Sequence, residues 1–394
     1  MTGEGEAQAL FGRTILQVTP ALDGGGDARA CVQVASALAE VGARALVAGA
    51  PGPFVSELQA RGGMFLALAS TTGNPLKIMS NRRDLERMVL DEGVELIHVR
   101  AGASLSAALK IARQARIPLV ADYAAGRAEA LDADTILVAS ASELDEARRL
   151  RPDVAKNLRQ SLRGVDLRRF AAETVEFSRM GQLRDALGVK PHVRLVIGID
   201  LPAECRGLFF AAAGALKARG FFANEAQEAR LVWLESRQRL GNFGLGNSGL
   251  GDFEAECARA GLAGEAARLV WDDRAAACLA SALVIVPSTA PQLCIEAQAL
   301  GSALAVLHPP GVMEAGFKEL PQPIPRPDGR PAQRGVWIVP VNQPQTLARA
   351  CEEAVRLGAS ARESLARRAR AHASGFSVER MCSLALAAYA RHFQ

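Results

Sequence analysis

Aromatic residues are scarce in this chain, at 5% of 394 residues, although 49% of the residues are hydrophobic. The core must therefore be built mainly from Ala, Leu and Val, which suits helices packed on parallel strands. A chain of this length exceeds what one compact core usually holds. It predicts two domains of about 150 to 200 residues each.

Cysteine patterns typical of disulfide frameworks or zinc sites are also absent. The seven cysteines are odd in number, lie far apart and form no CxxC or Cys/His spacing. We expect them to be reduced and mostly buried as small apolar residues. They are Cys31, Cys205, Cys257, Cys278, Cys294, Cys351 and Cys382.

The chain has neither a basic block nor a long apolar run. Its net charge is +4, from 46 basic and 42 acidic residues, and its arginines are scattered, which disfavours nucleic acid as a partner. No apolar stretch reaches membrane-spanning length, and residues 1–13 lack a basic start before an apolar run, so we expect a cytoplasmic protein. For Arg82, Arg83 and Arg87 two interpretations stay open: a solvated helix face, which we favour, or peripheral contact with an anionic inner membrane.

What the sequence does contain is a regular alternation of short apolar strands and helical patterns. Such a series predicts right-handed crossovers and parallel sheets with helices on both faces, that is, two Rossmann-like domains facing a central cleft. The first set has expected strands at 14–19, 45–48, 64–68, 96–99, 118–121 and 136–139, with helices at 27–41, 82–91 and 105–115. The second has strands at 193–197, 229–234, 267–271, 283–286 and 303–307, with helices at 203–218, 252–260, 275–281 and 294–300.

Three segments do not fit this alternation. Residues 171–190 are helical and charged, and we expect them to connect the two sets rather than to form core. Residues 240–251 contain five glycines, and residues 318–334 contain five prolines, so both are expected to be loops.

Four segments with candidate site residues follow expected strands. They are the glycine turn within 17–29, the basic segment 161–170, the segment 288–300 with Glu296 as its only acid, and the glycine turn 308–314. Ligands of open parallel sheets bind at the carboxyl ends of strands, where all four fall. For the first turn, ligand contact and a plain tight turn are equally good interpretations. A dinucleotide site is disfavoured there, because the glycines lack GxGxxG spacing and no acid ends the second strand.

In order and spacing, several segments together resemble a bacterial glycosyltransferase of family four with the GT-B fold. These segments are ILQVTPALDGGGDAR at 15–29, VASASELDE at 138–146, RGVDLRRF at 163–170, IEAQALGSALAV at 295–306, GVWIVPVNQPQTLARA at 335–350 and FSVERM at 376–381. The subgroup resembled acts on lipopolysaccharide core or other envelope polysaccharide. The likeness covers nearly the whole chain and is weakest at 199–266.

This resemblance implies an acceptor domain over residues 1–185, a nucleotide-sugar domain over residues 186–375, and a terminal helix within 376–394 that returns to the first domain. It implies donor contacts from Gly25, Gly26, Arg206, Glu296, Gly311 and Glu314, with the Glu296 carboxylate on the ribose hydroxyls. It places Arg29, Asp122 and Arg163 on the acceptor side. Neither a metal nor another cofactor is expected, because cationic side chains and helix N-termini stabilise the departing diphosphate in such enzymes.

The sequence departs from the family pattern at three site positions. Ser288 stands where the family has its first glutamate, Ala124 where it has a histidine, and Ile199 where it has a phosphate-binding arginine. Removing one preorganised donor typically lowers turnover about a hundred- to thousand-fold. Neighbouring groups offer replacements: Asp122 beside Ala124, and Asp200 or Arg206 beside Ile199.

Two classes of function follow. The first is a retaining, metal-independent transfer of a sugar from a nucleotide-sugar to an envelope glycan or lipid-linked glycan. The second is a catalytically inactive relative that binds nucleotide or glycan, or that assists a partner glycosyltransferase. An oxidoreductase is disfavoured by the glycine spacing.

Overall fold

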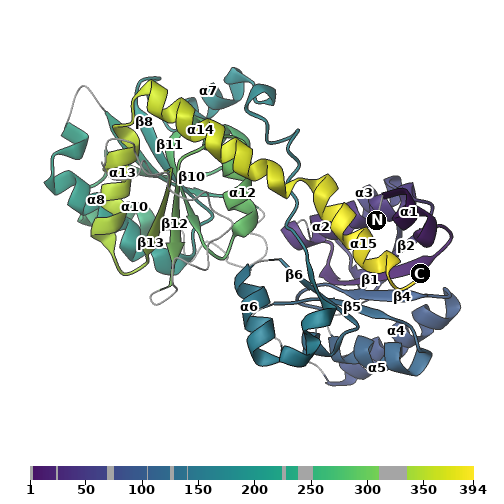
Figure 1. Cartoon of the computed structure of the whole chain (residues 1–394). Coiled ribbons are helices and arrows are strands. Elements are labelled where there is room, and N and C mark those ends of the chain that lie inside the picture. The colour runs from purple at the N-terminus through teal and green to yellow at the C-terminus, as the bar shows by residue number, and fades with distance from the viewer. Residues whose placement is uncertain are drawn as a thin grey trace. The chain divides into compact units, whose positions relative to one another are not determined.

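The computed structural model describes residues 3–23, 25–68, 75–103, 105–124, 128–139, 141–223, 228–237, 252–309 and 335–394. The chain divides into two compact units (Figure 1). The first contains Met1–Gly164 and Phe376–Gln394, and the second contains Val165–Gly375. Each unit is built on one parallel sheet with helices on both faces, so the predicted fold class is confirmed.

The first unit has a seven-stranded parallel sheet in the order β3-β2-β1-β4-β5-β6-β7. Its strands are β1 (Thr14–Ala21), β2 (Arg44–Ala50), β3 (Met64–Ala67), β4 (Leu96–Val99), β5 (Leu119–Asp122), β6 (Thr135–Val138) and β7 (Leu158–Gln160). Its helices are α1 (Gly3–Leu10), α2 (Gly26–Glu40), α3 (Val55–Ala60), α4 (Pro75–Asp91), α5 (Leu105–Ala115), α6 (Ala141–Leu150) and α15 (Val378–Ala390). Because β1 lies between β2 and β4, the strand order reverses direction at β1, which is where open sheets bind ligands.

Alternate residues of these strands build two separate cores. Ile15 and Leu96 point to the face covered by α1, α2 and α15, while Leu16 and Ile97 point to the face covered by α4, α5 and α6. A strand buried on both faces must be apolar throughout, which is why the sequence presents short unbroken apolar runs.

The last helix of the chain belongs to the first unit. α15 begins after Ser377, whose hydroxyl accepts a hydrogen bond from the Arg380 backbone N–H at 3.2 Å and so caps the helix. Its inner face, which includes the fully buried Tyr389, packs against α1 and α2. Figure 1 shows this yellow helix among the purple N-terminal elements.

The second unit has a six-stranded parallel sheet in the order β10-β9-β8-β11-β12-β13. Its strands are β8 (Arg194–Ile199), β9 (Ala229–Glu235), β10 (Ala266–Val270), β11 (Ser281–Pro287), β12 (Leu304–His308) and β13 (Val336–Pro340). Its helices are α7 (Phe177–Ala186), α8 (Arg206–Ala218), α10 (Asp252–Arg259), α11 (Arg274–Ala280), α12 (Pro291–Ala299), α13 (Pro344–Val355) and α14 (Ala359–Ala373). Here the order reverses at β8, between β9 and β11.

The segment 171–190, expected to connect the units without joining a core, lies in the second unit. Leu183 of α7 is fully buried, and Arg179 forms a two-bond ion pair with Asp273 at 2.7 and 2.8 Å. The expectation that this segment stays outside the core was wrong, because Val175, Leu183 and Leu187 are buried although charged and polar residues surround them in the sequence. The division between the units follows Gly164, against the boundary expected after residue 185. The expected loops at 240–251 and 318–334 lie outside the described residues.

All seven cysteines are free and buried, as expected. Burial raises the pKa of the Cys31 thiol to about 11, so this sulfur stays protonated and unreactive at neutral pH. No helix in the described part of the chain is both long and apolar enough to cross a membrane.

Replacing Gly164 by Ala should destabilise the first unit, because the residue touches α15 closely. A Cβ there would lie 2.9 Å from the Val378 Cα and 3.0 Å from the Met381 side chain. Overpacking of this kind costs about 1–3 kcal/mol. Urea unfolding measures the change. Gly5→Ala in α1 is the control, since a Cβ there meets nothing within 4 Å and should be neutral or stabilise by about 1 kcal/mol at most. Equal stability of the two variants would contradict the close packing of α15.

Candidate functional site

The first unit collects polar side chains near the carboxyl ends of β1, β4 and β5. Gln17 and His98 are neighbours in the strand register, Arg100 follows β4, and Asp122 ends β5. Gln17, His98 and Arg100 are buried, and they alternate with apolar residues so that they face α2 and α15. Of this group, only Asp122 is predicted from the sequence.

His98 links the sheet to the terminal helix. Its Nδ1 lies 2.6 Å from the Tyr389 hydroxyl, and its Nε2 lies 3.0 Å from Asp122 Oδ1. Burial lowers the pKa of His98, although the Asp122 charge acts in the opposite direction. The ring is therefore neutral at pH 7. Since a carboxylate only accepts hydrogen bonds, Nε2–H donates to Asp122, and Nδ1 accepts from Tyr389.

Arg100 balances the charge of Asp122. Its Nη1 lies 3.6 Å from Asp122 Oδ2, while its Nε and Nη2 donate to Gln17 Oε1 at 3.0 and 2.6 Å. Burial alone would raise the pKa of Asp122, but the hydrogen bond from His98 and the charge of Arg100 hold that pKa well below its usual range. Asp122 is thus an ionised, oriented carboxylate whose side chain is still 21% exposed.

The glycine turn expected at the first βα connection opens α2. Gly25 is the N-cap residue, and its N–H donates to Asp23 Oδ1 at 2.9 Å, while Gly26 is the first helical residue. One turn along, the Arg29 guanidinium stacks over the Phe54 ring at 4.5 Å. Arg163 pairs with Asp27 at 3.0 Å, and its charge also lowers the pKa of Asp122. The structure therefore places Arg163 and Asp122 at one edge, next to the start of α2.

The second unit has its own polar cluster at the carboxyl end of β8. Asp200 follows this strand with a left-handed backbone angle, φ of +49°, which costs an Asp some conformational energy. Its Oδ1 accepts from the Ser236 backbone N–H at 2.8 Å and from the Ser236 hydroxyl at 3.0 Å. Its Oδ2 accepts from Arg274 at 2.9 Å. These bonds orient a side chain that is only 12% exposed.

Arg274 connects Asp200 to Glu296. Its Nη1 lies 3.9 Å from Glu296 Oε2, and the Glu296 side chain is 10% exposed. Arg274 begins α11 directly after Asp273, the N-cap residue, whose carboxylate accepts from the Ala276 N–H at 3.1 Å and from Arg179. Two carboxylates thus share one guanidinium in a partly desolvated edge of the sheet.

Arg274 is not among the residues predicted from the sequence. The available signal was its position, because the run Asp272-Asp273-Arg274 follows β10 and opens a helix, as the other candidate segments do. Arg206, which is among the predicted donor-site residues, begins α8. Ile199 is fully buried, so a core residue stands where the resembled family has an arginine.

The remaining predicted site residues are divided between the units or lie outside the described residues. Gly25 and Gly26 belong to the first unit, whereas Arg206 and Glu296 belong to the second. Gly311 and Glu314 lie outside the described residues.

Comparison with known proteins shows similarity of structure without similarity of sequence. The chain matches no protein-family model, and it matches no curated protein. A glycosyltransferase from Rickettsia africae is 17% identical, with a TM-score of 0.76 over 97% of this chain and 99% of that one. HepE of Anabaena, solved with UDP-glucose, is 17% identical, with a TM-score of 0.69 over 95% and 98%. WaaG, a glycosyltransferase involved in lipopolysaccharide biosynthesis, is 12% identical, with a TM-score of 0.60 over 94% and 98%. At these identities the likeness shows the fold, which is GT-B.

The two histidines of the first unit whose pKa is lowered, His98 and His392, predict a loss of stability in mild acid. Burial lowers the pKa of His98 and of His392 below the ordinary 6.5, so the unfolded chain binds more protons than the folded one. Stability is then fully present above pH 6.5 and falls as the pH drops below it. The limiting slope is about 1.4 kcal/mol per pH unit for each histidine.

Urea unfolding between pH 7 and 5.5 measures this slope. His392→Gln removes one of the two contributions and leaves the Tyr389–His98–Asp122 contacts in place. A pH-independent stability of His392→Gln in this window would show that His98 is not held neutral.

Proposed function

We propose that this chain is a glycosyltransferase that moves a sugar from a nucleotide-sugar donor to a glycan acceptor. The observation that carries the proposal is the cluster of Asp200, Arg274 and Glu296 at the switch point of the second sheet. The structural similarity to solved GT-B glycosyltransferases extends over nearly the whole chain, and one of these proteins was solved with UDP-glucose. Ligands of parallel sheets bind at such switch points.

On the donor side, Glu296 is proposed to accept hydrogen bonds from the ribose hydroxyls. Arg274 and Arg206 are proposed to face the diphosphate, where negative charge develops as the sugar leaves. Arg206 also stands at the start of α8, where the helix dipole favours an anion. The roles predicted for Gly25, Gly26, Gly311 and Glu314 stay predictions.

On the acceptor side, Asp122 is proposed to orient a sugar hydroxyl. A carboxylate whose pKa lies well below its usual range is a weak proton acceptor, so orientation suits it better than proton removal. Arg163 and Arg29 would complete this side by binding acidic or hydroxyl groups of the acceptor. An envelope glycan acceptor, retention of configuration, independence of metal and peripheral contact with the inner membrane belong to the same proposal.

A catalytically inactive relative is the second candidate. The observation that favours it is that two carboxylates, Asp200 and Glu296, already compete for the Arg274 guanidinium. Ser288, Ala124 and Ile199 also stand at positions where the resembled family has polar site groups. Such a protein would bind a nucleotide or glycan, or assist a partner glycosyltransferase, without turnover.

Glu296→Gln should weaken nucleotide binding. A hydrogen bond to a charged group contributes about 1.5–3 kcal/mol, which corresponds to roughly ten- to hundredfold in Kd. Isothermal titration with UDP, UDP-glucose and the other nucleoside diphosphates measures it. Glu254→Gln, at an exposed position of α10, is the matched control. Absence of binding by the unaltered protein to every nucleotide in the panel would refute the glycosyltransferase proposal and the nucleotide site assigned to Glu296.

Turnover separates the two candidates. Release or transfer of the radiolabelled sugar is expected from the unaltered protein, equally with and without EDTA. Arg274→Lys keeps the charge but loses the planar fork, and it should lower turnover about ten- to thousandfold with binding less affected. Nucleotide-sugar binding with no sugar release or transfer to any acceptor would favour the inactive relative.

A further inference from the structure

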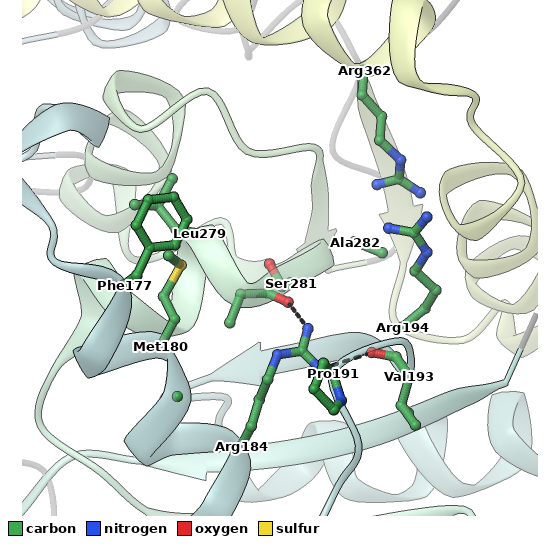
Figure 2. A pocket seen from close by; sticks show the side chains of 12 residues that line it. Phe177, Met180, Arg184, Pro191, Val193, Arg194, Leu279, Ser281, Ala282 and Arg362 are labelled. Atoms are coloured by element: carbon green, nitrogen blue, oxygen red, sulfur yellow. Dashed lines mark hydrogen bonds between the residues drawn. The ribbon is translucent and has the colours of Figure 1, made fainter.

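We propose that the second unit carries a separate anion-binding pocket, at the amino edge of its sheet, for a phosphate group attached to an apolar moiety. The cavity, of about 480 Å³, lies beside Arg194, the first residue of β8, and Ser281, the first residue of β11 (Figure 2). Asp200 and the rest of the carboxyl-edge cluster lie at the other end of the same strands. The pocket is therefore distinct from the proposed donor site.

Three arginines supply the charge of this pocket. Arg184 comes from α7, Arg194 from β8 and Arg362 from α14. The described residues that line the cavity include no Asp or Glu. Figure 2 shows the guanidinium groups of Arg194 and Arg362 pointing toward each other.

Two of the arginines are held in place by backbone carbonyls. Arg184 donates to the oxygens of Lys190, Val193 and Ala280 at 3.0 to 3.2 Å. These bonds fix the guanidinium before any ligand arrives, so little side-chain entropy remains to be lost on binding.

Arg362 is held in the same way by the end of α13. Its Nε donates to the Leu357 oxygen at 2.9 Å, and its Nη2 donates to the oxygens of Ala354 and Val355 at 2.8 and 3.1 Å. These bonds use Nε and one terminal nitrogen, and leave the Nη1 hydrogens for a ligand.

Arg194 differs, because no hydrogen bond or ion pair of its side chain is found among the described residues. Burial, and then the charge of Arg194, lower the pKa of both Arg184 and Arg362. Like charges that face one another without an intervening acid repel, and an anion placed between them converts this repulsion into attraction. A phosphate also matches the planar donor fork of arginine.

The opposite wall of the pocket is apolar. Phe177, Met180 and Leu279 form it (Figure 2), and Phe177 is 87% exposed. A cavity of about 480 Å³ lies in the size range of small-molecule sites and is far larger than one phosphate ion. The pocket therefore fits an organic phosphate better than inorganic phosphate.

Isothermal titration with phenyl phosphate, inorganic phosphate and phenol tests whether the pocket binds a phosphate joined to an apolar group. We expect phenyl phosphate to bind about tenfold or more tightly than inorganic phosphate, and phenol not to bind measurably. Dihexanoyl phosphatidic acid, below its micellar concentration, replaces the phenyl group by a lipid and so distinguishes a lipid phosphate from a small soluble one. No binding of either organic phosphate would overturn the proposal.

Arg194→Gln should weaken phenyl phosphate binding about tenfold or more, the loss typical of one charge-assisted contact. Arg259→Gln, at an exposed position of α10, is the matched control.

Phe177→Ser should weaken phenyl phosphate binding and leave the binding of inorganic phosphate unchanged. Because Phe177 is exposed, this substitution should not disturb folding. Arg274→Gln should keep the phenyl phosphate affinity while nucleotide binding suffers. Unchanged affinity in Arg194→Gln would refute the second site, and loss of affinity only in Arg274→Gln would assign the phosphate to the carboxyl edge instead.

Discussion

The hydrogen bond between Tyr389 and His98 is the contact on which the first unit depends most directly. It joins a strand to a helix 291 residues later in the chain, in a fully buried setting. Because the hydroxyl donates to Nδ1, the proton of the neutral ring lies on Nε2 and is directed at Asp122. The terminal helix thereby sets the orientation of a carboxylate at the ligand edge of the sheet. The geometry of the candidate site in the first unit therefore depends on how the end of the chain packs.

In the second unit, two nearly buried carboxylates lie beside one guanidinium, that of Arg274. Asp200 has additional donors in Ser236 and lies near the start of α11, whose dipole favours negative charge. Glu296 has the longer contact with Arg274, 3.9 Å against 2.9 Å. Glu296 is therefore the carboxylate more available to ribose hydroxyls. A diphosphate at this edge would require cationic groups beyond Arg274, and Arg206 is the second cation in the proposed donor site.

The alternation of strands and helices could be predicted because parallel strands buried on both faces read as short apolar runs. Elements with little apolar surface could not be predicted in this way. Such elements are α3, which buries only Leu58, β7, which has three residues, and α14, which carries a basic sequence around Leu365 and Ala369. The residues of the candidate site were harder to predict for another reason. Arg274 meets Asp200 across 74 residues of chain, and His98 resembles any residue of an apolar strand until Tyr389 is placed beside it. Contacts of such long range leave no local pattern.

The charged residues at the two edges of the second sheet have different structural explanations. At the amino edge the carbonyls at the ends of α11 and α13 accept hydrogen bonds from Arg184 and Arg362, so these two arginines have structural roles at helix C-termini. The carbonyls do not account for Arg194, which adds a third positive charge to the same pocket and lowers the pKa of both neighbours. A residue that disfavours its charged neighbours in the ligand-free state makes physical sense where an anion completes the arrangement. Arg194 is for that reason the residue that separates a purely structural arginine cluster from a binding site.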